Sequence, residues 1–412
     1  LSIRRQRQMC IRDRFNVNLD AYFGVQKAAK QLRMLNAQQF GDMLWQAMKN
    51  DGKTPSHDVY GNGDQAVVPE YLDSNHLIPS DDVDWVDEIL RAAVVQSYNL
   101  SFTKADKKSN QLFSLGYYDQ QGLVKFSDFK RVSGRFNSEY KLFDDHLRIG
   151  ENISLSHSWG TSVSNNAALG GTLYEAYKFQ SITPVKNLED EYAGNVFSDI
   201  PNPMGKLYRN KDNQDKKSRL VGNLYAELHL FDGLMFKTSF GVDYNNLYRR
   251  SFSPKYDELN ASEKLSSLSN RNAWNFNWVF TNTLTYNKTF GDHTINALLG
   301  MESLRNRYEY FTASRDGFPS DDPNFRFLDA GDVGTQKNSG AATEYSMVSY
   351  FGKLDYNYHD RYLVAFTLRR DGSSRLGNNK WGNFPAASVG WRISNEPFFD
   401  VEAISNLKVR VG

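Results

Sequence analysis

Residues 274–286 read WNFNWVFTNTLTY, and their alternation decides the fold of this chain. One register, from Trp274 to Tyr286, is almost entirely apolar and aromatic, whereas the other, from Asn275 to Thr285, is almost entirely polar. Successive side chains of a β-strand point to opposite faces, so this segment predicts a strand between an apolar and a wet surface. It covers about 13 residues, where a globular strand has about 5–6 and a tilted transmembrane strand needs about 9–11. The stretch therefore predicts a strand that crosses a membrane.

The same two-sided pattern recurs along the chain. It is clear in residues 15–23, 98–103, 131–142, 219–230, 236–244, 348–358 and 362–369, and weaker in residues 112–118 and 147–155, where Glu151 interrupts it. Further strands are expected near residues 294–303, 385–393 and 407–412, which gives a total of about 13.

The predicted connections alternate between short and long. The short ones lie near residues 104–109, 143–146, 231–233, 288–293, 359–361 and 395–405, and the long ones near 24–93, 119–128, 160–217, 249–272, 307–343 and 372–384. Asp232-Gly233 is a hairpin signal. If each strand crosses once, the short turns share one side and the long loops the other, as in outer-membrane barrels.

Composition limits the alternatives. Among 412 residues, Lys and Arg number 49 and Asp and Glu 48, a net charge of +1 that gives no electrostatic case for nucleic acid. The mean hydropathy is −0.61, and no run of about 18 apolar residues predicts a membrane helix. The aromatic content of 14% suits a lipid-facing barrel wall, although a large soluble β protein could reach it. Cys10 is the single cysteine, which rules out a disulfide framework.

The first long loop contains one clear helical pattern. Asn36 is a candidate N-cap, and the apolar residues that follow it at helical spacing are Phe40, Met43, Leu44, Ala47 and Met48. Two interpretations stay open: a small loop subdomain that packs its own core, which we favour, and a helix that docks a partner.

Two long motifs connect the chain to a known family. RRDGSSRLG at 369–377 and WGNFPAASVGWRISNEPF at 381–398 resemble the barrel of SusC/RagA-type TonB-linked outer-membrane transporters, and the likeness extends over residues 15–412. The residues that carry these motifs are Arg369, Asp371, Gly372, Ser373, Ser374, Arg375, Trp381, Pro385 and Trp391.

The resemblance implies an all-β fold, a transmembrane antiparallel up-and-down β-barrel of which about 13 of about 22 strands are present, with a plugged lumen in the intact protein. It implies import of an extracellular nutrient, with a SusD-like surface lipoprotein, the TonB–ExbB–ExbD complex and outer-membrane lipid as partners and a glycan or peptide as ligand. We expect residues 1–14, an arginine-rich stretch without an apolar core, to be a non-native tail. Residues 15–412 are then the N-terminal part of the barrel, truncated at both ends and without the plug, which would not form a working pore by itself.

No catalytic or metal-binding constellation is evident. The seven histidines are scattered, and no pair has the spacing of metal ligands. Clusters at Asp81, Asp82 and Asp84, at Asp212 and Asp215, and at Asp321 and Asp322 could supply oxygen ligands to calcium. Solvated loops are the interpretation we favour, so no cofactor is predicted.

Two groups of residues are candidates for ligand contact. Aromatic side chains in the long loops could stack on sugar rings, although core packing is the alternative for each; they are Trp45, Tyr60, Tyr71, Trp85, Tyr174 and Tyr177. Polar strand residues should face the lumen and contact the plug or a passing ligand; they are Arg131, Arg135, Asn137, Asn223, Asn275 and Asn277.

The sequence thus favours TonB-dependent import of an oligosaccharide, with no enzymatic activity. A passive porin or adhesin barrel is one alternative. A soluble glycan-binding or glycan-cleaving β protein is another, and the cleaving form would need a carboxylate pair.

Overall fold

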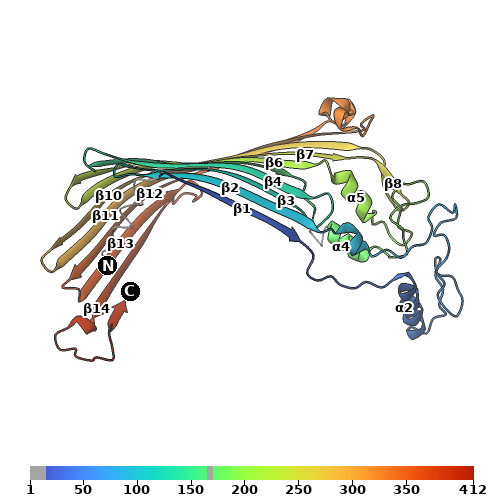
Figure 1. Ribbon diagram of the computed structural model, residues 1–412, viewed down its shortest axis with the longest axis horizontal. Coiled ribbons are helices and arrows are strands. Elements are labelled where there is room, and N and C mark those ends of the chain that lie inside the picture. Colours follow the sequence, from blue (N-terminus) through green and yellow to red (C-terminus); the bar gives the residue numbers. More distant parts are fainter. Residues whose placement is uncertain (1–14, 165–169) are drawn as a thin grey trace.

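The computed structural model describes residues 15–164 and 170–412, so the predicted tail at 1–14 lies outside the described residues. One antiparallel sheet of 13 strands dominates the fold (Figure 1). The strands pair in chain order, as an up-and-down wall requires: β1 (Phe15–Gln26), β2 (Ala93–Ala105), β3 (Ser109–Gln121), β4 (Asp128–Leu142), β5 (Leu147–Gly160), β6 (Gln214–Phe231), β7 (Leu234–Ser253), β10 (Ser267–Phe290), β11 (His293–Asp316), β12 (Lys337–Tyr358), β13 (Tyr362–Ser373), β14 (Trp381–Arg392) and β15 (Lys408–Val411).

The remaining elements are short and lie in the connections. They are the helices α2 (Ala37–Asn50), α3 (Trp85–Ile89), α4 (Thr172–Lys178) and α5 (Pro203–Asn210), the hairpin β8 (Tyr256–Glu258) with β9 (Ala261–Glu263), and the 3₁₀ turns η2 (Pro323–Phe325), η3 (Leu328–Ala330), η4 (Val333–Thr335) and η5 (Ile393–Asn395).

The sorting of connections is confirmed, with two corrections to their lengths. Short turns gather at one end of the sheet, and the helices α2, α4 and α5 at the other (Figure 1). Residues 122–127, expected to be part of a long loop, form a tight connection because β3 and β4 continue as strands up to it. The connection expected near 395–405 as a short turn is a longer excursion over residues 393–407 with η5, because β15 begins only at Lys408 and pairs with the last residues of β14. Several loops are also shorter than expected, since β7, β10 and β11 continue past the end of their apolar pattern.

The alternating pattern creates two faces. The apolar face carries Trp278, Phe280 and Leu284 on β10 and meets the apolar registers of the neighbouring strands. Its large side chains are exposed rather than packed in a core; Leu299, for example, is 64% exposed. Exposed apolar surface on this scale marks contact with lipid. The polar face carries the other register.

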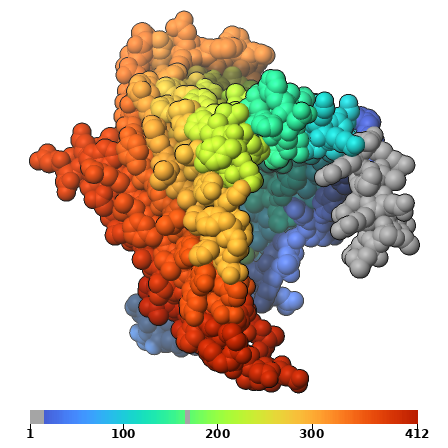
Figure 2. Space-filling model, turned by 90° about the vertical axis from the view of Figure 1, so that its left-hand side faces the viewer, coloured from blue at the N-terminus to red at the C-terminus, as the bar shows by residue number. Residues whose placement is uncertain are grey.

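Aromatic pairs lie toward both ends of the apolar face. Tyr350 stacks on Trp381 at 6.2 Å toward the long loops, and Tyr358 stacks on Tyr362 at 6.3 Å beside a short turn. Such pairs are typical of the aromatic girdles of outer-membrane barrels. In the view from the short-turn end, the C-terminal part of the chain, coloured orange and red, runs without a break from the top to the bottom of the molecule (Figure 2).

Charges mark where the lipid-facing zone ends near the long loops. On the apolar-face register of β11 and β12, Arg305 pairs with Glu344 at 2.8 Å and Arg307 with Glu309 at 2.8 Å. Arg307 also lies 5.7 Å from the ring of Trp274. Placing ionised pairs of this kind in hydrocarbon costs free energy. Trp274, which was expected to face lipid, therefore lies at the boundary of the lipid-facing zone.

Candidate ligand-binding loops and polar face

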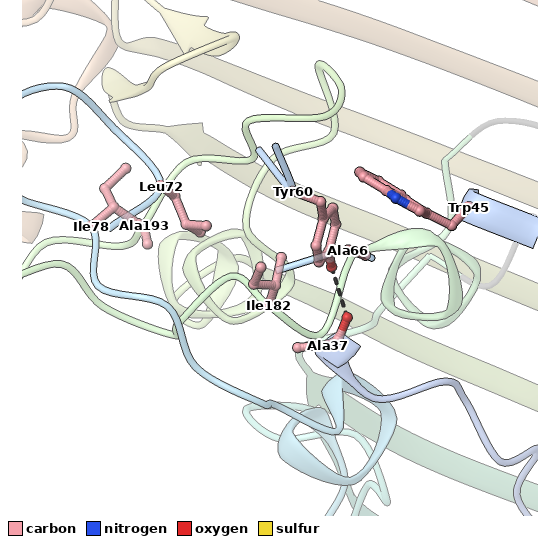
Figure 3. Close-up of a cluster of buried hydrophobic side chains, with 8 residues drawn as sticks. All are labelled: Ala37, Trp45, Tyr60, Ala66, Leu72, Ile78, Ile182 and Ala193. Atoms are coloured by element: carbon pink, nitrogen blue, oxygen red, sulfur yellow. Dashed lines mark hydrogen bonds between the residues drawn. The ribbon is translucent and has the colours of Figure 1, made fainter. Parts of the chain in front are cut away.

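The long loops fold into a body with its own hydrophobic clusters. The first cluster joins α2 to residues 60–78 and to Ile182 and Ala193 (Figure 3). The predicted helix is confirmed: Asn36 caps it, and its side chain and that of Gln39 form a reciprocal capping box. The buried face differs in part from the expected one. Ala37, Gly41 and Trp45 are buried, whereas Met43 is exposed, because the helix packs along the line that its small residues leave open.

Two of the candidate aromatics belong to this first cluster. Trp45 is 3% exposed and donates its indole N–H to the carbonyl of Gly63 at 2.9 Å. Tyr60 is 1% exposed and donates its hydroxyl to the carbonyl of Ala37 at 2.9 Å, the bond drawn in Figure 3. Burial, with a smaller effect of Asp82, raises the pKa of Tyr60 to about 12. Both rings hold the loop body together and present no free face to a ligand.

The second cluster packs α3, α4 and α5 together. Trp85 is 2% exposed, lies edge-on to Phe179 at 4.6 Å and donates its indole N–H to the carbonyl of Gln180. The expected ligand contact is therefore not supported for Trp85, Trp45 or Tyr60, because packing and backbone hydrogen bonds use their surfaces. Tyr177 is half-buried at the edge of this cluster.

The remaining two candidates are more accessible. Tyr71 is half-buried and meets the ring of His76 edge-on at 4.9 Å. Tyr174 is 43% exposed, with the ammonium of Lys178 5.1 Å from its ring.

A pocket of about 530 Å³ opens among three loop segments that sequence reasoning did not bring together. We call it the tyrosine pocket, because Tyr192, Tyr208 and Tyr256 line it together with Lys211 and Arg326. Tyr192 and Tyr208 lie 5.9 Å apart between ring centroids. Lys211 lies 3.6 Å from the ring of Tyr208, and Arg209 lies 3.9 Å from that of Tyr256. Its volume suits a small ligand.

A buried ion pair fixes one wall of the tyrosine pocket. Glu258, 3% exposed, accepts hydrogen bonds from Arg209 at 2.5 Å and from the backbone N–H of Asn202 at 2.7 Å. Burial raises the pKa of Glu258, and Arg209 opposes that rise. Burial also raises the pKa of Tyr192 and Tyr256. The ion pair thus ties Arg209 of α5 to the β8–β9 hairpin. Both acidic and basic groups line the opening, among them Asp212, Lys255 and Asp257.

The six strand residues expected in the lumen share the polar face. The pairing register places Asn137 opposite Asn152 and Asn152 opposite Asn223, which forms a row of amides across three strands. Asn275 accepts a hydrogen bond from Asn306 at 2.9 Å. Arg131 and Arg135 on β4, and Asn277 on β10, have the same orientation by register.

The family-motif residues divide between the two faces. On the polar face, Arg369 donates to Asp371 at 2.7 Å and to Ser349 at 2.9 Å, and lies 3.5 Å from Glu302. At the end of β13, beside Gly372, the backbone N–H of Ser373 donates to the carbonyl of Lys380, Ser374 exchanges hydrogen bonds with Ser346, and Arg375 lies over the ring of Tyr345. Trp381, Pro385 and Trp391 have the apolar-face register of β14.

Protein partners occupy most of the acidic loop residues considered for calcium. Asp84 caps α3, Asp322 caps η2, and Asp82 accepts the backbone N–H of Ala37. Asp212 pairs with Arg326 and Asp215 with Arg249. Within residues 15–164 and 170–412, no group of three or more His, Cys, Asp or Glu side chains is arranged to hold a metal ion.

Comparisons with known proteins agree with the fold. No family model matches the chain. It is 30% identical over 354 residues to TonB-dependent receptor P3 of Formosa agariphila, which covers 84% of this chain and 35% of the relative. It is 29% identical over 360 residues to TonB-dependent receptor SusC of Bacteroides thetaiotaomicron, covering 80% of this chain and 34% of the relative. The chain thus spans about a third of the length of these relatives.

The solved structure of the RagAB peptide transporter superposes with a TM-score of 0.78 at 21% identity, over 96% of this chain and 46% of that one. This likeness confirms the barrel fold. Among the described helices, none has the length and apolar character that a membrane crossing would require.

Proposed function

Because the chain belongs to the SusC/RagA-type TonB-dependent receptors of the outer membrane, we propose that it forms part of an importer that captures an extracellular oligosaccharide through its long loops. The tyrosine pocket is the observation that carries this proposal. Aromatic rings offer flat apolar faces to the C–H surfaces of sugars, and neighbouring charged and polar groups supply hydrogen bonds to hydroxyls. Tyr174, Tyr71 and Tyr177 are proposed as further contacts on the same loop body.

The polar face would guide the ligand after capture. The amide row that includes Asn137 and Asn223, together with Arg131, Arg135, Asn275 and Asn277, would contact the plug or the passing ligand. Amides and guanidinium groups donate and accept hydrogen bonds with sugars while remaining solvated in a water-filled lumen.

Binding to the protein purified from outer membranes tests the oligosaccharide proposal. A panel of oligosaccharides is titrated against the wild type, Tyr208→Ala and Tyr248→Ala. Tyr208 lines the tyrosine pocket, whereas Tyr248 is a matched tyrosine on the apolar-face register of β7. Loss of one stacking ring is expected to weaken binding about 5–10-fold, since aromatic contacts contribute roughly 1 kcal/mol. If both variants bind like the wild type, the pocket is not the capture site.

A peptide ligand is the second candidate. The observation in its favour is that Lys211, Lys255 and Arg326 line the tyrosine pocket alongside Asp212 and Asp257, a mixture suited to charged termini. Peptides in the same titration distinguish the two: peptide binding should weaken strongly with added salt, whereas sugar binding should hardly change.

We further propose energisation by the TonB–ExbB–ExbD complex and capture assisted by a SusD-like surface lipoprotein. The relatives are named as TonB-dependent receptors, and the loop body stands at the end of the sheet where a lid would close. Uptake that persists in cells lacking TonB would favour the passive porin, and copurification of a surface lipoprotein would support the lid.

A further inference from the structure

The apolar face contains a hollow away from the ligand-binding loops. A groove of about 610 Å³ crosses strands β1 to β7, and its floor and walls are formed by side chains of the apolar face, chiefly Leu115, Val132, Leu155 and Leu220. We call it the lipid-side groove. Its lining is almost wholly apolar, so it adds nothing to a water-filled path for a sugar or peptide.

A glycine creates the hollow. The pairing register sets Leu115, Gly134, Leu155 and Leu220 side by side across four strands, so one position in a row of leucines has no side chain. An added Cβ at Gly134 would meet only the tip of Leu115, at 3.8 Å. The space above Gly134 is therefore open, and a larger residue there would fill the groove without straining the backbone.

The rim of the lipid-side groove is polar toward the long loops. Tyr98, Tyr117 and Tyr244 line it. His157, opposite Val132, shares a 2.8 Å hydrogen bond with Ser218. One step further along the strands, still on the apolar-face register, come Lys130, Trp159 and Lys216, which are cross-strand neighbours.

Both lysines reach solvent, and Lys130 also faces a carboxylate. Lys216 is exposed. Lys130 is half-exposed and lies 4.0 Å from Asp119, whose carboxylate also accepts hydrogen bonds from Tyr117 and Gln96. The side chains of the apolar-face register thus become more polar toward the long loops: leucines come first, then tyrosines and a histidine, and then lysines. That sequence matches the order of acyl chain, ester zone and phosphate in a lipid whose headgroup points toward the long loops.

We propose that the lipid-side groove binds an acyl chain of an anionic lipid of the outer leaflet, with its phosphate beside Lys130 and Lys216. The occupant is a lipid because the groove faces the membrane. It is anionic because Lys130 and Lys216 stand at its headgroup end. It is an outer-leaflet lipid because that end points toward the long loops rather than toward the short turns.

Lipid retention by the protein purified from outer membranes tests the proposal. After delipidation, lipid A or zwitterionic phosphatidylethanolamine is added, and bound lipid is counted by native mass spectrometry. Gly134→Val fills the groove. Each acyl methylene displaced from apolar surface weakens binding about fourfold, so the loss of two predicts about 15-fold weaker retention of lipid A. Lys216→Gln is expected to weaken lipid A about fivefold and to leave phosphatidylethanolamine unchanged.

Gly222→Val is the matched control. Gly222 lies on the apolar face of β6 outside the groove, and an added Cβ there would make only ordinary contacts, the nearest at 3.7 Å. The proposal predicts that Gly222→Val retains lipid A like the wild type. Equal retention by the wild type and Gly134→Val, or equal retention of lipid A and phosphatidylethanolamine by the wild type, would overturn it and identify the bound lipid as adventitious.

Discussion

Replacing Leu284 by arginine tests the assignment of the two faces. Leu284 lies on the apolar face of β10, between Phe236 of β7 and Leu299 of β11, and is 36% exposed. The strand ends at Phe290 beside a short turn. At about 3.3 Å per residue and a tilt of about 40°, Leu284 stands roughly 15 Å from that end, near the middle of an apolar band about 25 Å tall.

The expected loss of stability is about 2–4 kcal/mol, the cost of an arginine that faces lipid at this depth. Thr285→Arg is the control, because Thr285 is the next residue and points to the polar face at nearly the same height. Its arginine would remain in water, so a change within about 0.5 kcal/mol is expected.

Both variants are measured after the protein is folded into lipid vesicles. Urea titration followed by tryptophan fluorescence gives the free energy of unfolding, and the mobility of unheated samples in gels reports the folded fraction. Equal stability losses in the two variants, or a larger loss for Thr285→Arg, would refute the assignment of lipid to the apolar face.

Four further predictions concern the loops and the polar face. Glu258→Gln should destabilise the β8–β9 hairpin by about 3–5 kcal/mol, because it leaves Arg209 buried without its partner; faster amide hydrogen exchange in residues 256–263 would show it, and unchanged exchange would contradict it. Tyr60 should stabilise the loop body fully below pH 10, and this contribution should vanish between pH 10 and about 12, since the unfolded chain loses its phenol proton first; in a phenolate absorbance titration, Tyr60→Phe should remove one of the late-titrating tyrosines. Arg369→Met should cost about 1 kcal/mol, because Glu302 and Asp371 lose their shared cation; an unchanged urea midpoint would contradict this. Gly150→Val should cost about 1–3 kcal/mol, because its Cβ would fall 2.4 Å from the ring of Tyr225; thermal unfolding would measure the loss, with Gly222→Val as the neutral comparison.

The alternation of apolar and polar residues was sufficient to predict the sheet. The strands follow from a period of two that each segment carries in its own residues, and the capped start of α2 follows from Asn36 and Gln39. The lengths of strands were harder, because β10 and β11 continue where both registers are polar and no contrast marks them. The short helices α3, α4 and α5 were missed, since contacts between distant loop segments stabilise them rather than a long periodic pattern.

The candidate site was less accessible to sequence reasoning. Aromatics in long loops were reasonable candidates, but the sequence did not distinguish Tyr60, which closes a core, from Tyr208, which lines an opening. Tyr192, Tyr208 and Tyr256 meet only after two long loops have folded against each other. The signal that was available is the local clustering of Lys, Arg and Tyr near residues 206–211 and 254–258.

Because the strands differ in length, the edge of the sheet at the long-loop end is slanted. β1 has 12 residues and β3 has 13, whereas β10 and β11 have 24 each. The loops of residues 27–92 and 161–213 follow the short strands β1 and β5. The long strands β7, β10 and β11 are followed by shorter connections. A bulky ligand that approaches this edge therefore meets extended sheet beside the long strands and folded loops beside the short ones.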